Sequence, residues 1–142
     1  MRYRFVDEIV SLALDGTARI EVIKRFEPDD DVFSGPRESR RVPESILLEL
    51  MAMTGGQLIV RRLGQGRLPL LLKVPECRFH DDASAGERLR AVASLGGLSS
   101  VADGTSVAET DTAVYVDAQP IARAKLLFAC VEVARVVTGV RP

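Results

Sequence analysis

The sequence has few of the residues that build metal centres and disulfide frameworks. Its 142 residues include two cysteines, Cys77 and Cys130, and one histidine, His80. The cysteines lie far apart in apolar stretches, without the paired spacing of a zinc site, and two are too few for a disulfide framework. We therefore expect buried free thiols in a reducing cytoplasm, and neither a metal ion nor another cofactor.

The chain also lacks an excess of charge of either sign. Its formal net charge is −1 at pH 7, with 46% hydrophobic and 27% charged residues. Binding to nucleic-acid phosphates calls for a basic excess, and disorder calls for lower hydrophobicity with a larger net charge. The composition therefore predicts a folded protein and argues against nucleic acid as its main partner.

Long apolar runs are missing as well, because a membrane span needs about 18 uninterrupted apolar residues. The closest stretch, residues 46–60, is interrupted by Glu49 and Gln57. Near the N-terminus, Asp7 and Glu8 stand where a signal peptide would have its apolar core. The length suits one hydrophobic core. We expect a single cytoplasmic domain over the 142 residues, without a membrane partner.

The N-terminal part of the sequence predicts a hairpin followed by a loop. Residues 5–14 are rich in β-branched and aliphatic side chains and end at Asp15 and Gly16, a strong turn signal. Residues 17–26 supply the partner strand. Residues 27–41 are rich in Asp, Arg, Pro and Gly, which is typical of a loop.

The clearest helix is predicted over residues 43–63. Pro43 suits a first helical turn, where its missing N–H would have no partner. Apolar residues occupy nearly every face of the segment, which is typical of a buried helix. Gly55 and Gly56 lower the helix propensity in its middle, and we interpret them as a place where a neighbouring backbone packs closely.

Strands separated by turns are predicted for the rest of the chain. Pro75 implies a bulge or an unpaired edge position, Gly96 and Gly97 end the second strand, and residues 98–106 are ambiguous. Two strands, one helix and then several strands is an α+β order, in which a helix that is apolar on all sides needs a sheet curled around it. The predicted strands cover residues 68–79, 89–95, 107–116 and 121–137.

Short motifs follow one another along the chain in a recognisable order. They are Phe5-Val6-Asp7, Phe33-Ser34-Gly35, Val42-Pro43, Ile46-Leu47-Leu48-Glu49-Leu50-Met51-Ala52, Arg78-Phe79, Ala85-Gly86-Glu87-Arg88-Leu89, Val116-Asp117 and Ile121-Ala122-Arg123-Ala124. In order and spacing they resemble the (3R)-hydroxyacyl-[acyl carrier protein] dehydratases. The resemblance implies the hotdog fold, with one long central helix wrapped by a curled antiparallel sheet, and dimers with acyl tunnels at their interface.

The resemblance also implies chemistry on an acyl thioester of acyl carrier protein or coenzyme A. In that family a loop histidine takes the α-proton, a helix carboxylate of the other subunit assists departure of the hydroxyl, and a backbone N–H polarises the carbonyl. Glu49 stands at the carboxylate position and is the predicted catalytic residue. The predicted substrate-binding positions are Phe33, Gly35, Pro36, Glu44 and Met53.

Three of these positions depart from the family pattern. Pro36 replaces the loop histidine and can neither accept nor donate a proton. Glu44 replaces a glycine at the helix start and places a charge beside the carbonyl site. Met53 replaces a glutamine that follows the carboxylate by four residues. The only histidine, His80, is predicted at an exposed strand end, away from this loop.

Two charged segments allow simple interpretations. Residues 29–31 are three aspartates without the spaced oxygen ligands of a cation loop, so a solvated turn is predicted. Arg37, Arg40 and Arg41 either form a solvated loop or attract an acidic acyl carrier protein or the phosphates of coenzyme A.

Four functions are compatible with the sequence. The favoured one is a dehydratase-like protein that either is degenerate or depends on a histidine-bearing hotdog partner. The alternatives are a thioesterase in which Glu49 activates water, a non-catalytic subunit, and a module that only binds acyl thioesters. In each case we expect a homodimer or a heterodimer with a second hotdog subunit.

Overall fold

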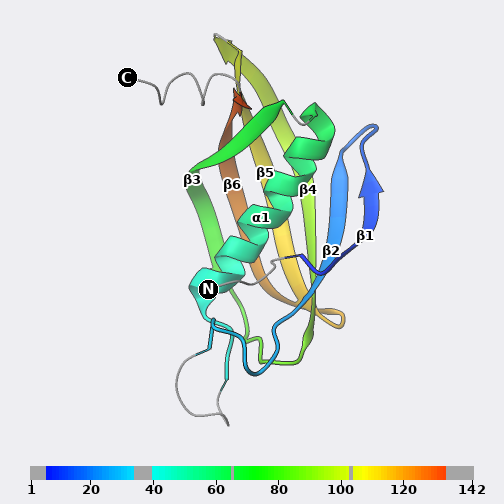
Figure 1. The fold of residues 1–142 in the computed structure, drawn as a ribbon, viewed down its shortest axis with the longest axis vertical. Helices are drawn as coiled ribbons and strands as arrows, with labels where there is room; N and C mark the ends of the chain where they lie inside the picture. Colours follow the sequence, from blue (N-terminus) through cyan, green and yellow to red (C-terminus); the bar gives the residue numbers. More distant parts are fainter. Residues whose placement is uncertain (1–5, 34–39, 65, 103, 134–142) are drawn as a thin grey trace.

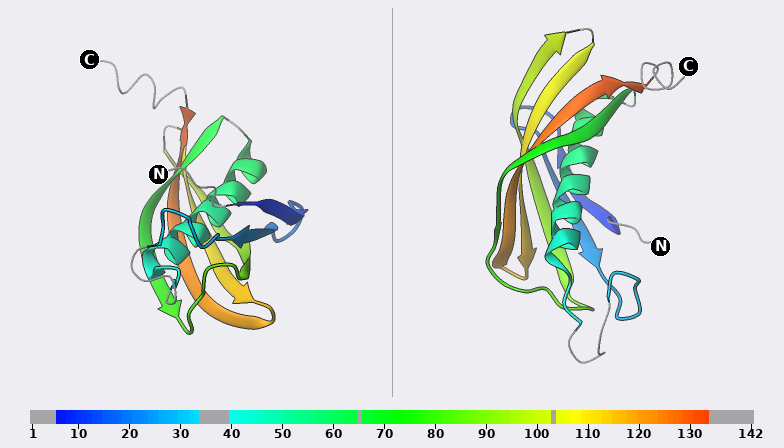
Figure 2. Two further views of the ribbon diagram at one scale, coloured as in Figure 1. Left: turned by 60° about the horizontal axis from the view of Figure 1, so that its bottom comes forward. Right: turned by 90° about the vertical axis from the view of Figure 1, so that its left-hand side faces the viewer.

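The computed structural model describes residues 6–33, 40–64, 66–102 and 104–133. The described part contains one helix and six strands, which form a single antiparallel sheet in the order β1-β2-β4-β5-β6-β3. The helix lies along one face of the sheet (Figure 1), and the sheet curves around it (Figure 2). The elements are β1 (Glu8–Ala13), β2 (Arg19–Arg25), α1 (Glu44–Leu63), β3 (Arg67–Phe79), β4 (Arg88–Ala102), β5 (Thr105–Val116) and β6 (Gln119–Glu132).

This arrangement confirms the predicted α+β architecture of one long helix wrapped by a curled antiparallel sheet. The turn between β1 and β2 contains Gly16 at φ 65°, a left-handed conformation that favours glycine. The register of β3 against β6 shifts between Lys73 and Glu76, so the bulge predicted at Pro75 is present. The loop predicted over residues 27–41 contains no helix or strand where it is described.

The predicted strand boundaries differ most around Gly96 and Gly97. Instead of ending there, β4 continues to Ala102, and its register against β5 shifts between Leu95 and Leu98. A bulge accommodates an additional residue while the pairing on both sides continues. The glycine pair is thus a bulge rather than a strand end, and the ambiguous segment belongs to the two paired strands and their turn.

Two further boundaries are corrected at the ends of elements. Pro43 is the N-cap residue of α1 rather than its first helical residue. The last turn is confined to Asp117 and Ala118, with Asp117 at φ 54°, and β6 already begins at Gln119. Residues 134–137, predicted as the end of that strand, lie outside the described residues.

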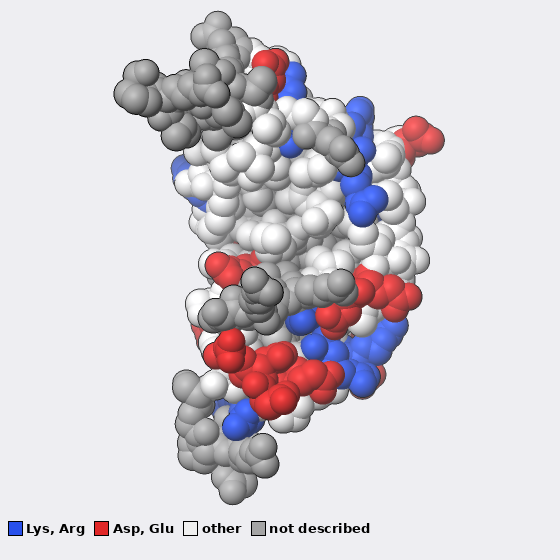
Figure 3. All heavy atoms as spheres, in the orientation of Figure 1, with Lys and Arg blue, Asp and Glu red and all other residues white. Residues whose placement is uncertain are grey.

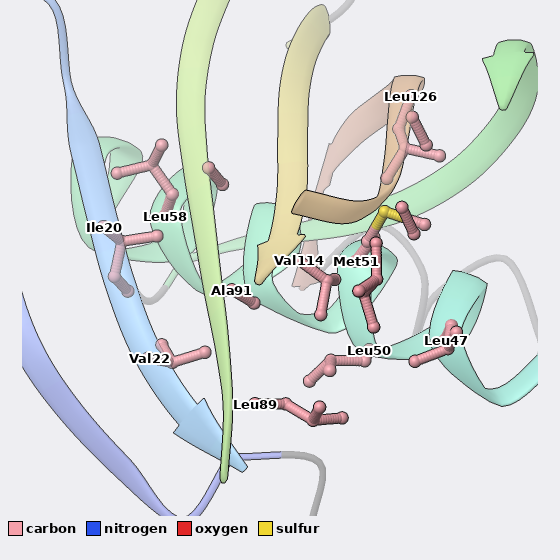
Figure 4. Packing of buried hydrophobic residues seen from close by; sticks show 14 of the residues in the cluster. Ile20, Val22, Leu47, Leu50, Met51, Leu58, Leu89, Ala91, Val114 and Leu126 are labelled. Carbon is pink, nitrogen blue, oxygen red and sulfur yellow. The ribbon is translucent and has the colours of Figure 1, made fainter. Parts of the chain in front are cut away.

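The core lies between α1 and the concave face of the sheet. Alternate residues of the central strands point toward the helix, as expected from the two-residue period of a strand. The helix presents its residues at three- and four-residue spacing. Figure 4 shows this packing, with side chains from Ile20, Val22, Leu47, Leu50, Met51, Leu58, Leu89, Ala91, Val114 and Leu126 meeting in one cluster.

The helix approaches the sheet most closely at Gly55. A Cβ atom at this position would lie 2.7 Å from Oγ1 of Thr110 on β5, whereas a Cβ at Gly56 would meet nothing closer than Cγ of Pro69 at 3.7 Å. The interpretation of close packing is therefore confirmed at Gly55. At Gly56 the contact is an ordinary one.

These two glycines predict opposite effects on stability. We expect Gly55→Ala to lower the free energy of unfolding by about 1–3 kcal/mol, because the added methyl group overpacks the buried Thr110. Gly56→Ala should raise it by about 0.5–1 kcal/mol through helix propensity alone. Urea unfolding at one protein concentration measures both values. Equal effects of the two substitutions would show that the helix does not contact β5 at Gly55.

Candidate functional site

One face of α1 points away from the sheet and is open in this chain. Glu49 is exposed, and Met53, one turn further on, leaves 46% of its surface accessible. The apolar composition of the helix predicted burial on all sides. This prediction is wrong for the face that carries Glu49 and Met53. Each step of four residues turns by about 40° around a helix, so Gln57 and Arg61 continue a row that turns progressively away from Glu49. We call Glu49, Met53, Gln57 and Arg61 the open row.

Glu49 lies in the second turn of α1, on the side opposite the core. Among the described residues, its carboxylate has no hydrogen-bond or ion-pair partner. A carboxylate in this position is accessible to water and keeps its oxygens free to accept a proton. The neighbouring Leu50 and Met51 point the other way, into the core.

Phe33 is half-buried at the end of the described part of the loop. Its ring meets that of Phe26 edge to face, with ring centres 6.5 Å apart and an interplanar angle of 86°. The ammonium group of Lys24 lies 5.0 Å from the centre of the Phe26 ring and 3.2 Å from Asp7 Oδ1. Gly35 and Pro36 lie outside the described residues.

Glu44 is the first residue of α1 and is exposed. Its side chain lies close enough to β3 to act on Cys77: burial raises the pKa of the Cys77 thiol, and the negative charge of Glu44 raises it further. Cys77 and Cys130 are free thiols, as predicted, but of the two only Cys130 is buried, and Cys77 is half-buried.

A cavity of about 410 Å³ lies between α1 and the strand β3, at the edge of the sheet. Of the predicted site residues it includes Met53, but not Phe33, Glu44 or Glu49. Four leucines of β3 leave 38–58% of their surface accessible. We call this cavity the β3 groove. It is lined by Ala52, Met53, Gly56, Gln57, Val60, Leu68, Pro69, Leu70, Leu71 and Phe128.

A second cavity lies on the other side of the open row. Its volume is about 420 Å³, and it shares Gln57 and Val60 with the β3 groove. Sequence analysis assigned no role to its polar lining residues, although the four-residue spacing from Glu49 to Arg61 was a usable signal. We call this cavity the β1 groove. It is lined by Leu12, Leu14, Gln57, Val60, Arg61 and Gly64.

His80 lies on the other side of the sheet. It directly follows β3, is exposed as predicted, and donates its backbone N–H to Ile121 O at 2.7 Å. Its side chain lines a hollow of about 490 Å³ on the outer face, together with Asp111 and Arg123. Two hydrogen bonds from Arg123, of 3.0 and 2.7 Å, lower the pKa of the Asp111 carboxyl. The sheet therefore separates His80 from Glu49.

The predicted solvated turn is present at residues 29–31, where Asp30 Oδ2 accepts a hydrogen bond of 2.7 Å from the Glu27 N–H. Arg41 is exposed and pairs with Asp82 at 3.2 Å. Nε of Arg40 is buried and has no hydrogen-bond partner among the described residues. Arg37 lies outside them.

Comparison with solved structures identifies the fold. The chain is similar to a hot-dog-like protein from Thermanaerovibrio acidaminovorans, with a TM-score of 0.62 and 14% identity over 89% of this chain and 90% of that one. It is similar to a thioesterase superfamily member from Thermus thermophilus, with a TM-score of 0.64 and 15% identity over 89% and 90%. It is also similar to a hypothetical thioesterase from Streptococcus pneumoniae, crystallised with coenzyme A, with a TM-score of 0.61 and 14% identity over 88% of each chain.

The chain thus has the α+β hotdog fold. No protein-family model and no curated protein matches its sequence. At these identities the likeness extends to the fold and not to a particular family. Within the described ranges, α1 is not long and apolar enough to cross a membrane.

The position of Glu44 predicts the reactivity of Cys77. Glu44→Gln should lower the pKa of the Cys77 thiol, because the thiolate no longer forms beside a negative charge. At a fixed, mildly alkaline pH, iodoacetamide should therefore alkylate Cys77 faster in this variant than in the wild type. The same measurement on Cys77→Ser isolates any contribution from Cys130. An unchanged rate in Glu44→Gln would place Glu44 away from β3.

Proposed function

We propose that the protein binds acyl thioesters and hydrolyses them, with Glu49 as the base that activates water. The observation that carries this proposal is the exposed carboxylate without a partner on the open face of the central helix. A general base must reach the proton that it removes, and here the Glu49 side chain is exposed to water. This chemistry needs no histidine.

The reaction takes place in two steps. Glu49 accepts a proton from water while the oxygen attacks the thioester carbonyl, which forms a tetrahedral oxyanion. The intermediate then expels the thiolate, which takes the proton back from Glu49 and leaves as the thiol, and the acyl group is released as a carboxylic acid. Donors are needed at the oxyanion, and the first N–H groups of a helix are free to donate.

The structural comparisons support a thioester substrate. One similar structure belongs to the thioesterase superfamily, and another is a hypothetical thioesterase that holds coenzyme A. Neither of these two similarities favours dehydration of a hydroxyacyl thioester over hydrolysis of the thioester. The thioesterase alternative therefore becomes our first choice, ahead of the dehydratase-like protein that the sequence motifs favoured.

A dehydratase shared between two chains is our second candidate. Pro36 stands where the family has its proton-abstracting histidine, and His80 lies on the far side of the sheet from Glu49. A base within hydrogen-bond reach of the α-carbon would then have to come from another subunit. The observation that keeps this candidate is the exposure of Glu49, which leaves it accessible to such a subunit.

We also propose that two copies pair through β3. This strand is an edge of the sheet, and an unpaired edge invites pairing with another strand. The strand exposes three consecutive leucines. The accessible fractions of their surface are 44% for Leu70, 45% for Leu71 and 58% for Leu72. Pairing of the same strand across a two-fold axis would bury these leucines in an isologous interface and cover the β3 groove.

Substitution of Glu49 tests the hydrolytic proposal. We expect the purified protein to hydrolyse acyl thioesters from a panel of acetyl to dodecanoyl chains, and Glu49→Gln to lower kcat about 10²–10⁴-fold through loss of the base. Release of thiol, followed with a chromogenic disulfide, measures the rate. Glu8→Gln, which neutralises an exposed carboxylate on β1, is the matched control and should keep the full rate.

The same preparation separates the two candidates. An enoyl thioester mixed with the lone protein should not be hydrated, because no base lies beside Glu49. Hydration at an ordinary enzymatic rate, abolished by His80→Ala, would contradict our placement of the histidine. If hydration appears only with a histidine-bearing hotdog partner and is lost in Glu49→Gln, while no thioester is hydrolysed, the shared dehydratase replaces the thioesterase.

Light scattering tests the pairing through β3. At micromolar concentration we expect a mass of twice the 15.5 kDa of one chain. Leu71→Glu should shift the mass toward the monomer, because the two-fold axis would bring a buried charge from each copy into the interface. Val101→Glu, at a residue that leaves 64% of its surface accessible, should leave the dimer intact. A monomeric wild-type protein would rule out the interface.

A further inference from the structure

The outer face of the sheet, opposite α1, carries apolar residues on its strand β6. Residues 126–131 of this strand are all apolar. Every second one of them is buried in the core, and the others point to the outer face, where they are half-buried. A strand that is apolar on both faces is typical of a sheet covered on both sides, whereas in the described part of the chain the helix covers only the inner face (Figure 2). The outward residues are Leu127, Ala129 and Val131.

The two neighbouring strands extend this apolar surface. Val107 of β5 lies directly opposite Ala129, and residues in such pairs point to the same face of a sheet. Beside them at the edge, Leu68 and Leu70 of β3 leave 38% and 44% of their surface accessible. A contiguous apolar patch of this kind marks an interaction site. We call Val107, Leu127, Ala129 and Val131 the outer patch.

Two charged side chains flank the outer patch on opposite sides. Glu109 of β5 and Lys73 of β3 both lie directly opposite Leu127 of β6. Negative, apolar and positive side chains therefore follow one another across the three strands. Within the described ranges, neither charged group has a hydrogen-bond or ion-pair partner. By contrast, Asp111, two residues further along β5, is paired with Arg123 at 2.7 Å.

We propose that the outer patch binds the outer patch of a second copy of this chain, around a two-fold axis that runs along β6. Such an axis brings each outward residue of β6 against its own counterpart and places β5 of one copy over β3 of the other. Glu109 of each copy then faces the partner's Lys73. The contact is isologous. Packed sheets are about 10 Å apart, and a glutamate and a lysine side chain together span such a gap.

The order of the charges favours a second copy over other partners. A row of negative, apolar and positive side chains becomes its own complement when it is turned about its middle, so one chain supplies both members of each ion pair. A lipid surface would instead remove water from Glu109 and Lys73 without pairing them, which is unfavourable. The contact uses the outer face of the sheet rather than the edge of β3, so it is independent of the pairing proposed through that strand.

Sedimentation velocity from micromolar to submillimolar concentration tests the contact. The outer patch is small, and small interfaces associate weakly, so the mass should double only toward the upper end of this range. Ala129→Glu places a charge from each copy next to the axis and should raise the Kd of this association roughly tenfold or more. Ala13→Glu, at an exposed residue of the opposite edge strand β1, is the matched control and should leave the Kd unchanged.

Charge reversal tests the two-fold arrangement itself. Glu109→Lys and Lys73→Glu should each raise the Kd roughly tenfold or more, because like charges then face each other twice in every pair. An equimolar mixture of these two variants should associate again, because every contact between the two kinds of chain joins opposite charges. The variant that carries both substitutions should associate like the wild type. Glu8→Lys, on β1, is the control for charge reversal, and circular dichroism verifies that each variant is folded.

The background Leu71→Glu separates this contact from pairing through β3. In that background the mass should still double with concentration, from one chain to two, and Ala129→Glu should still prevent the doubling. Loss of all association in Leu71→Glu would contradict the proposal, because β3 would then account for it.

Three further results would overturn the inference. In the first, the mixture of Glu109→Lys and Lys73→Glu associates no better than either variant alone, so the two charges do not face each other. In the second, association appears only after deletion of residues 134–142, which would assign the outer patch to that segment. In the third, the protein binds phosphatidylcholine vesicles through Ala129 and does not self-associate, which would assign the patch to a lipid surface.

Discussion

The close approach of α1 to β5 at Gly55 is the constraint on which the rest of the structure depends. One helix has to supply the core of a six-stranded sheet, and it does so only where its backbone comes close enough for side chains on both sides to interlock. A glycine against Thr110 permits that distance. Leu50, Met51 and Leu58, on the same side of the helix, are then fully buried.

The sheet packs against one side of the helix, so the opposite side remains accessible to ligands. Glu49 is one position from the buried Leu50, yet it points outward, since successive residues of a helix turn by about 100°. The Glu49 carboxylate, for which we propose a catalytic role, therefore needs no separate loop or pocket to position it; the core residues around it fix the helix, and the helix fixes the carboxylate. The sheet, in turn, keeps His80 away from it.

The apolar edge of β3 and the groove beside it suit a second copy of the chain, whereas Glu49 lies on a part of the open face outside both grooves. The grooves meet at Gln57 and Val60. Pairing through β3 would thus place the second copy beside the residues that the two grooves share.

Local sequence determined where α1 and the strands lie, the turn at Gly16 and the bulge at Pro75, because each depends on side-chain periodicity and backbone preferences within a few residues. It did not determine that β4 continues past Gly96, since only pairing with β5 stabilises that bulge. Nor could it show which side of the apolar helix stays open, because burial depends on the strands that pack against it. The motif order made Glu49 the predicted catalytic residue, but its exposure and its separation from His80 by the sheet were decided by the tertiary structure, which brings together residues far apart in the sequence.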